Sequence, residues 1–179
     1  METNTTNMYL HQFNETIDKW IGYLNDYSLE MLCLSPQTGS WSLGQVYVHI
    51  INDTNYFVGQ IKATLFTGDN IEMEMHEHGK AIFANNGFPD VMIEGPSTNV
   101  YIPQPKNKEM LLQDLSHIKE KVNHLAVTYD FSQSKGKTRH PGLLFFTSLE
   151  WLRFAEMHMR HHLRQKKRID AVLVKPDTK

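Results

Sequence analysis

The sequence predicts an all-α protein without strands, a four-helix bundle with a long crossover between helices 2 and 3. Three observations lead to this fold. Four long segments carry apolar residues at alternating spacings of three and four, the period of one helix face. Two of these segments begin with a capping-box pattern. The crossover, residues 69–104, contains three glycines and three prolines, which are typical of turns rather than of a continuous helix.

Length and charge narrow the possible classes of protein. The chain has 179 residues and a formal net charge of −2, which suits a single domain over residues 1–179 with no drive toward nucleic acid or anionic membrane. No apolar segment is long enough to cross a bilayer, and residues 1–9 do not resemble a signal peptide. The only cysteine, Cys33, cannot form an intramolecular disulfide. We therefore expect a cytoplasmic protein, with a disordered tail at 175–179.

The first and third helices are predicted over residues 5–27 and 107–129, each with an unbroken apolar face. We expect both to contribute core and the third to contribute no chemistry. The crossover is expected to contain one short helix near residues 77–85, to pack across the bundle and to cover a site. Its two histidines, His76 and His78, are interpreted as surface residues, because ligands two residues apart require a strand or turn.

The second helix is predicted from Ser42, where Gln45 completes a capping box, to about Phe66. His49 and Asp53 lie one turn apart at the edge of its buried face. A histidine in such a position is more often a hydrogen-bonded core residue than a metal ligand. Asp53 is either the hydrogen-bond partner of His49 or an acid on the helix surface. This helix alone therefore does not decide between structure and chemistry.

The fourth helix is predicted over residues 147–170, where Thr147 and Glu150 form another capping box. Its inward-facing seam includes His158 and His162, although a bundle seam should be apolar. Because these two histidines are four residues apart, both rings can reach one metal ion from the same side. Alternatively, they lie on a solvated cationic face near the helix C-terminus, where positive charge is favourable. The spacing alone leaves both interpretations open.

A third histidine on a facing helix would complete a metal site, because bundle interiors are where facing helices build such sites. Three histidines, His49, His158 and His162, would leave one coordination position open, which is the catalytic rather than the structural pattern. A divalent ion there lowers the pKa of a bound water toward about 7, or holds a thiol as its reactive thiolate. Zinc suits three imidazoles, and nickel, copper or iron would also bind them.

Two motifs resemble signatures of the DinB/YfiT-like superfamily. Residues 41–49, Trp-Ser-Leu-Gly-Gln-Val-Tyr-Val-His, resemble its second-helix motif. The segments 140–142, His-Pro-Gly, and 158–165, His-Met-Arg-His-His-Leu-Arg-Gln, resemble its fourth-helix motif. The order of the motifs and the gap of about a hundred residues between them also match. The resemblance therefore extends over the whole chain.

The resemblance implies a four-helix bundle, often a homodimer, with a divalent ion, zinc or nickel, on His49, His158 and His162. His161 matches an extra histidine that is not usually a ligand in this family. Together with Asp53, it is a candidate to support the ligands. Some relatives transfer or isomerise substrates with low-molecular-weight thiols such as bacillithiol or mycothiol, and others are described as metal-dependent hydrolases. The resemblance does not choose between these two reactions.

The predicted function is therefore a metal-dependent enzyme that acts on a small-molecule substrate. It is either a hydrolase that activates water or a bacillithiol-transferase-type S-transferase with a low-molecular-weight thiol as cosubstrate; the sequence identifies no catalytic acid or base. The alternative is a non-catalytic bundle that dimerises or binds a partner through an exposed helix face. A third possibility, nucleic-acid binding through residues 135–139 and 160–168, is disfavoured by the net charge.

Overall fold

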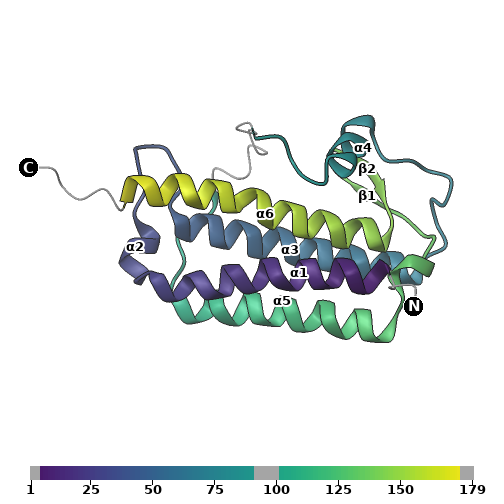
Figure 1. Ribbon diagram of the computed structural model, residues 1–179, viewed down its shortest axis with the longest axis horizontal. Helices are drawn as coiled ribbons and strands as arrows, with labels where there is room; N and C mark the ends of the chain where they lie inside the picture. Colours follow the sequence, from purple (N-terminus) through teal and green to yellow (C-terminus); the bar gives the residue numbers. More distant parts are fainter. Residues whose placement is uncertain (1–4, 91–100, 174–179) are drawn as a thin grey trace, which may run out of the picture.

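The computed structural model describes residues 5–90 and 101–173. Four long helices run side by side (Figure 1), and their bounds are Thr5–Tyr23 for α1, Leu43–Phe66 for α3, Lys108–Thr128 for α5 and Ser148–Leu173 for α6. Helices α3 and α1 both pack against α6, and α5 packs against α1 and α3. The predicted four-helix bundle is confirmed, with its long crossover between α3 and α5. No helix of the described residues is long and apolar enough to cross a membrane.

Shorter elements connect the long helices, with bounds Leu24–Asp26 for η1, Leu29–Cys33 for α2, Glu77–Ala84 for α4, Phe131–Gln133 for η3, Thr138–His140 for β1 and Leu144–Phe146 for β2. Helix α4 confirms the short helix expected in the crossover. The two strands pair antiparallel and lie beside α4 at one end of α6 (Figure 1). The expectation of a chain without strands was therefore wrong, because three-residue strands are too short to show an alternating pattern.

Both predicted capping boxes form. Ser42 Oγ accepts the Gln45 N–H at 3.1 Å, and the Gln45 side chain accepts the Ser42 N–H at 3.0 Å. At the start of α6, Thr147 Oγ1 accepts the Glu150 N–H at 3.3 Å, and Glu150 accepts the Thr147 N–H at 2.8 Å. Each cap contributes about 1 kcal/mol to helix stability. Because a cap determines where the helix begins, it also determines which later side chains face the bundle interior.

Two buried hydrogen bonds join three helices at the level where the histidines lie. Trp20 of α1 donates its indole N–H to the Met159 carbonyl of α6 at 3.1 Å. Tyr47 of α3 donates its hydroxyl to the Trp20 carbonyl at 2.9 Å. All three side chains are fully buried, so these bonds satisfy polar groups that would otherwise be costly in the core. They hold α1, α3 and α6 in fixed relative positions.

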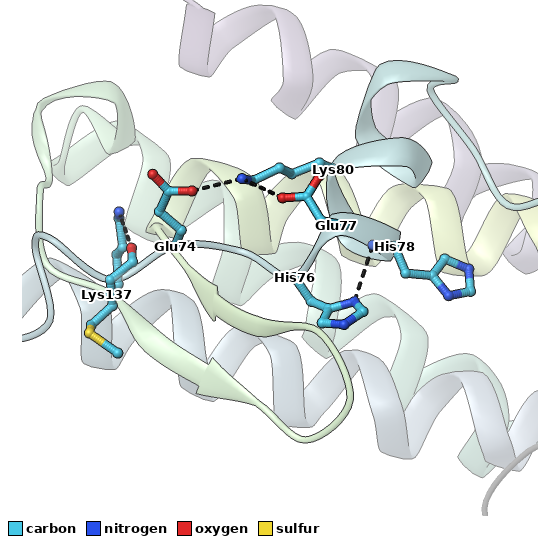
Figure 2. Close-up of polar contacts among 7 residues, drawn as sticks. Glu74, His76, Glu77, His78, Lys80 and Lys137 are labelled. Carbon is cyan, nitrogen blue, oxygen red and sulfur yellow. Dashed lines mark hydrogen bonds and ion pairs between the residues drawn. The ribbon is translucent and has the colours of Figure 1, made fainter.

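Polar contacts at the start of α4 order this part of the crossover (Figure 2). His76 Nδ1 accepts the His78 backbone N–H at 3.1 Å, so its side chain caps the helix. Lys80 pairs with Glu74 at 2.7 Å and with Glu77 at 2.8 Å. Both histidines are exposed, as predicted for surface residues.

The end of the crossover packs closely against the first turn of α3, and this gives a test of the packing. A Cβ on Gly44 would lie 2.7 Å from Pro105 Cδ and 2.8 Å from the Leu32 carbonyl oxygen. We expect Gly44→Ala to lower the free energy of unfolding by about 1–3 kcal/mol. Gly59→Ala, on the same helix with open space around the new Cβ, should raise it by roughly 0.5–1 kcal/mol. Urea unfolding measures the free energy of unfolding of both variants. Equal changes in Gly44→Ala and Gly59→Ala would contradict the close packing at Gly44.

Candidate metal centre

Three histidine rings meet between α3 and α6. His49 comes from α3, and His158 and His162 lie one turn apart on α6. The Nε2 atom of His162 is 3.1 Å from Nε2 of His49 and 3.2 Å from Nε2 of His158. One ring nitrogen from each residue lies within 4.8 Å of the other two. The structure thus brings together the three residues that the sequence nominates as ligands; their binding of a metal stays a prediction.

All three imidazoles are uncharged near neutral pH, because their surroundings disfavour the protonated form. His49 and His162 are only 5% and 8% exposed. Burial, and then the positive charge that a neighbouring histidine would carry, lowers the pKa of His49 to about 4 and that of His162 to about 3. The same two causes lower the pKa of His158 well below its usual value. Neutral imidazole is the form that binds metals.

The hydrogen bonding of the rings fits a cation better than it fits three histidines alone. His162 Nδ1 lies 2.8 Å from Gln165 Oε1, an oxygen that can only accept, so Nδ1 carries the hydrogen and Nε2 presents its lone pair. That one lone pair faces two other ring nitrogens and cannot serve both well. Tetrahedral zinc holds nitrogen ligands at about 2.0–2.1 Å from the metal, and so about 3.3 Å apart. The observed separations of 3.1 and 3.2 Å are close to this value.

Support for the ligands is uneven. Metal-binding histidines usually donate their second ring N–H to an acceptor, which fixes the tautomer and the ring orientation. Gln165 provides this contact to His162. Among the described residues, Nδ1 of His49 and Nδ1 of His158 have no hydrogen-bond partner. In the sequence, Gln165 is the last residue of the 158–165 motif, and no role was predicted for it. Its position three residues after His162 is the signal that could have identified it.

Asp53 and His161 are the two residues expected to support the ligands. Asp53 Oδ2 lies 3.7 Å from Nε2 of His49 and 3.5 Å from Nε2 of His158, and burial raises the pKa of this carboxyl to about 6. The His161 ring lies 5.2 Å from the His162 ring, and its Nδ1 is 3.1 Å from the Arg164 guanidinium. Asp53 therefore adjoins the converging nitrogens, whereas His161 points to the neighbouring surface of α6.

Aromatic rings enclose the cluster. Trp41 lies 5.1 Å from the His49 ring, Phe57 lies 5.5 Å from the His158 ring, and Phe88 of the crossover lies 6.3 Å from the His158 ring. Such walls exclude water and strengthen electrostatic interactions inside the site. The sequence did not single out Phe88, because the path of the crossover depends on tertiary contacts rather than on local periodicity.

The His-Pro-Gly motif forms the turn between β1 and β2. His140 Nδ1 accepts the backbone N–H groups of Gly142 and Leu143, each at 3.1 Å. Leu144 completes the turn with a φ of 68°, a conformation that leucine rarely adopts. Burial lowers the pKa of His140 to about 4, so the ring stays neutral and keeps accepting. The motif thus shapes the hairpin that leads into α6 and is separate from the three converging histidines.

Comparisons with known proteins agree with this architecture. The sequence profile of the DinB superfamily matches residues 12–165, and no curated protein matches the chain. TT2238, described as a four-helix bundle protein, is 14% identical with a TM-score of 0.61, and the match covers 91% of this chain and 98% of TT2238. YfiT from Bacillus subtilis, described as a probable metal-dependent hydrolase with an unusual four-helix bundle topology, is 13% identical with a TM-score of 0.64, covering 96% of this chain and 89% of YfiT. Because the family profile spans most of the sequence, the chain belongs to the DinB superfamily.

Proposed function

We propose that this protein is a metal-dependent hydrolase whose divalent ion, zinc or nickel, is held by His49, His158 and His162. The convergence of three neutral ring nitrogens in a buried site carries the proposal. Membership of the DinB superfamily and the similarity to YfiT, itself described as a probable metal-dependent hydrolase, support it. Three protein ligands leave a position for a small-molecule substrate or water.

A divalent ion in such a site supplies the Lewis acidity that lets water lose a proton near neutral pH. Asp53 accepts that proton in this proposal. Its carboxylate oxygen lies 3.5 Å from His158 Nε2 and 3.7 Å from His49 Nε2, close enough to the converging nitrogens to take a proton from a water held among them. Phe57 and Phe88 limit access of bulk water from two sides. Gln165 keeps the His162 ring in the tautomer that presents Nε2.

The role of Asp53 gives a specific prediction. Asp53→Asn should lower the hydrolysis rate of activated ester substrates by about 10²–10⁴-fold, the usual contribution of a general base. The bound-metal content should stay unchanged, because Asp53 is not one of the three ligands. Asp114→Asn, an exposed aspartate on α5, is the matched control. Loss of metal from Asp53→Asn would instead make Asp53 a ligand, and an unchanged rate would remove it from the reaction.

The proposal itself is tested by elemental analysis of protein purified without a nickel column, together with two assays. The first follows ester hydrolysis without any thiol, and the second follows conjugation of an aryl halide electrophile with bacillithiol or mycothiol. Metal-dependent hydrolysis without thiol supports the proposal, whereas activity only with thiol makes the protein an S-transferase. A metal-free chain whose melting temperature does not respond to zinc contradicts both reactions.

The alternative of a non-catalytic dimerisation or binding module predicts that His49→Ala leaves stability and partner binding nearly intact. The homodimer, the cytoplasmic location, the single domain over residues 1–179 and the absence of nucleic-acid binding stay predictions. The expected disordered tail, residues 175–179, lies outside the described part of the chain.

A further inference from the structure

A pocket of about 470 Å³ lies beside the histidine cluster. One wall is formed by residues 85–89 of the crossover. The other is formed by side chains of α6, namely Met157, Arg160, His161 and Arg164. The volume is within the usual range for small-molecule sites, about 300–1,000 Å³. Of its lining residues, only Phe88 takes part in the proposed reaction, where it limits access of bulk water.

The pocket adjoins the candidate metal centre through two shared rings. The His161 ring lies 5.2 Å from the His162 ring on one side and 5.2 Å from the Phe88 ring on the other. Phe88 in turn lies 6.3 Å from the His158 ring. A small molecule bound in the pocket would therefore be separated from the converging histidines only by the ring of His161 or Phe88.

Arg160 is held rigidly in the pocket wall. Its Nε and Nη2 atoms bind the two carboxylate oxygens of Glu156 at 2.8 and 3.0 Å, and Nη2 also donates to the Asn86 carbonyl at 2.8 Å. These contacts leave the Nη1 group without a hydrogen-bond partner among the described residues. A guanidinium fixed in this way can bind a ligand with little further loss of side-chain entropy.

Arg164 brings a second guanidinium to the pocket. Its Nη2 atom donates to the Phe88 carbonyl at 2.8 Å and to His161 Nδ1 at 3.1 Å, so His161 carries its own hydrogen on Nε2 and is a donor there. Asp90 lies 3.5 Å from Arg164 and 3.7 Å from Arg168, so two cations share one carboxylate. No acidic residue is among those that line the pocket. Arg160, Arg164 and Arg168 outnumber Glu156 and Asp90 by one, so the site is rich in donors and has a small excess of positive charge.

We propose that this pocket binds an oxyanion group of the substrate, a carboxylate or a phosphate, and that the enzyme acts on small organic anions. Charged donors bind oxyanions through short, strong hydrogen bonds. The apolar body of the substrate packs on Met157 and Phe88 while its anionic end contacts Arg160 and Arg164. This role rests on the proposed function, because it takes the neighbouring histidine cluster as the reaction centre.

The test uses benzoate, phenyl phosphate and benzamide, the last being a neutral analogue of benzoate. Each is titrated into the full-length protein while NMR records the arginine Nε–Hε signals. We expect saturable shifts with at least one of the two anions, weakened by added salt, and none with benzamide. Benzoate alone identifies a carboxylate site, phenyl phosphate alone a phosphate site, and both a general oxyanion site. No saturable shift with either anion, or an equal response to benzamide, overturns the inference.

Three variants locate the site. Arg164→Gln should weaken anion binding by about tenfold, the effect of one charge-assisted hydrogen bond, whereas Arg139→Gln, exposed on β1, should not. An equal loss in both variants, or in neither, overturns the inference. If Arg164→Gln does not fold, the wild-type titration still decides. His162→Ala should keep anion binding while losing metal; anion binding that disappears with the metal contradicts a separate pocket. Protein that binds metal but no anion contradicts this inference and leaves the proposed function intact. Protein that binds anions but no metal supports the anion pocket and contradicts the proposed function.

Discussion

Replacing His162 by alanine is expected to weaken zinc or nickel binding by more than about a hundredfold. The reason is its central position, since its Nε2 atom lies 3.1 and 3.2 Å from the other two ring nitrogens. Loss of a group that merely orients a ligand costs about 10–100-fold in metal affinity, so loss of the ligand itself should cost more. Gln165→Ala, which removes such an orienting group, should fall within that lower range.

His161→Ala is the matched control, one residue earlier on the same helix. Its Nδ1 contacts Arg164 rather than the cluster, so metal affinity should stay nearly unchanged. Competition with a chromophoric chelator, using protein without a histidine tag, measures all three variants, and circular dichroism confirms that each is folded. Equal losses in His161→Ala and His162→Ala would show that general destabilisation, rather than ligation, causes the effect.

The metal-free protein is expected to lose stability steeply as the pH falls from 6.5 toward 4. The pKa values of His49 and His162 in the folded chain are about 4 and about 3, below the ordinary value of 6.5. In this window the unfolded chain binds protons at these two histidines that the folded chain does not. The stabilising contribution of the two neutral rings is therefore complete above pH 6.5 and is lost as the pH falls toward their pKa values in the folded chain. Each residue contributes roughly 1.4 kcal/mol per pH unit.

Asp53 acts in the opposite direction. Its pKa is raised from 3.8 to about 6. Between these pH values the folded chain binds a proton at Asp53 that the unfolded chain does not, which offsets part of the stability lost through the histidines. Urea unfolding at pH 7 and pH 5 measures the net effect. His162→Gln should reduce the pH dependence by about 1.4 kcal/mol per pH unit, and zinc should stabilise more at pH 7 than at pH 5 because it needs neutral imidazole. Equal unfolding free energies at pH 7 and pH 5 would contradict the depressed histidine pKa values.

The long helices could be predicted because their signals are local. The Ser42–Gln45 and Thr147–Glu150 pairs mark helix starts within four residues, and both capping boxes form. Elements that depend on tertiary contacts were missed. The predicted first helix continued to Tyr27, whereas α1 ends at Tyr23 and tightens into a 3₁₀ turn. Helix spacing does not separate these two forms over a few residues.

The candidate site was predictable in part. His158 and His162 follow from their spacing of four on one helix, and their meeting with His49 required the assumption that two separate helices face each other. The approach of Phe88 to His158 could not be predicted, because it depends on how the crossover folds back over α6. The donors of Arg160 and Arg164 contact the same segment, so the adjacent pocket could not be predicted from the sequence either.

Arg160 and Arg164 attach to the crossover through the main-chain oxygens of residues 86 and 88. A backbone oxygen is present whatever amino acid occupies the position. Exchanging the side chain at position 88 would therefore reshape the wall between pocket and histidines without releasing the segment from α6. Such an attachment allows selectivity to diverge, by evolution or by engineering, while the helical scaffold beneath it stays the same.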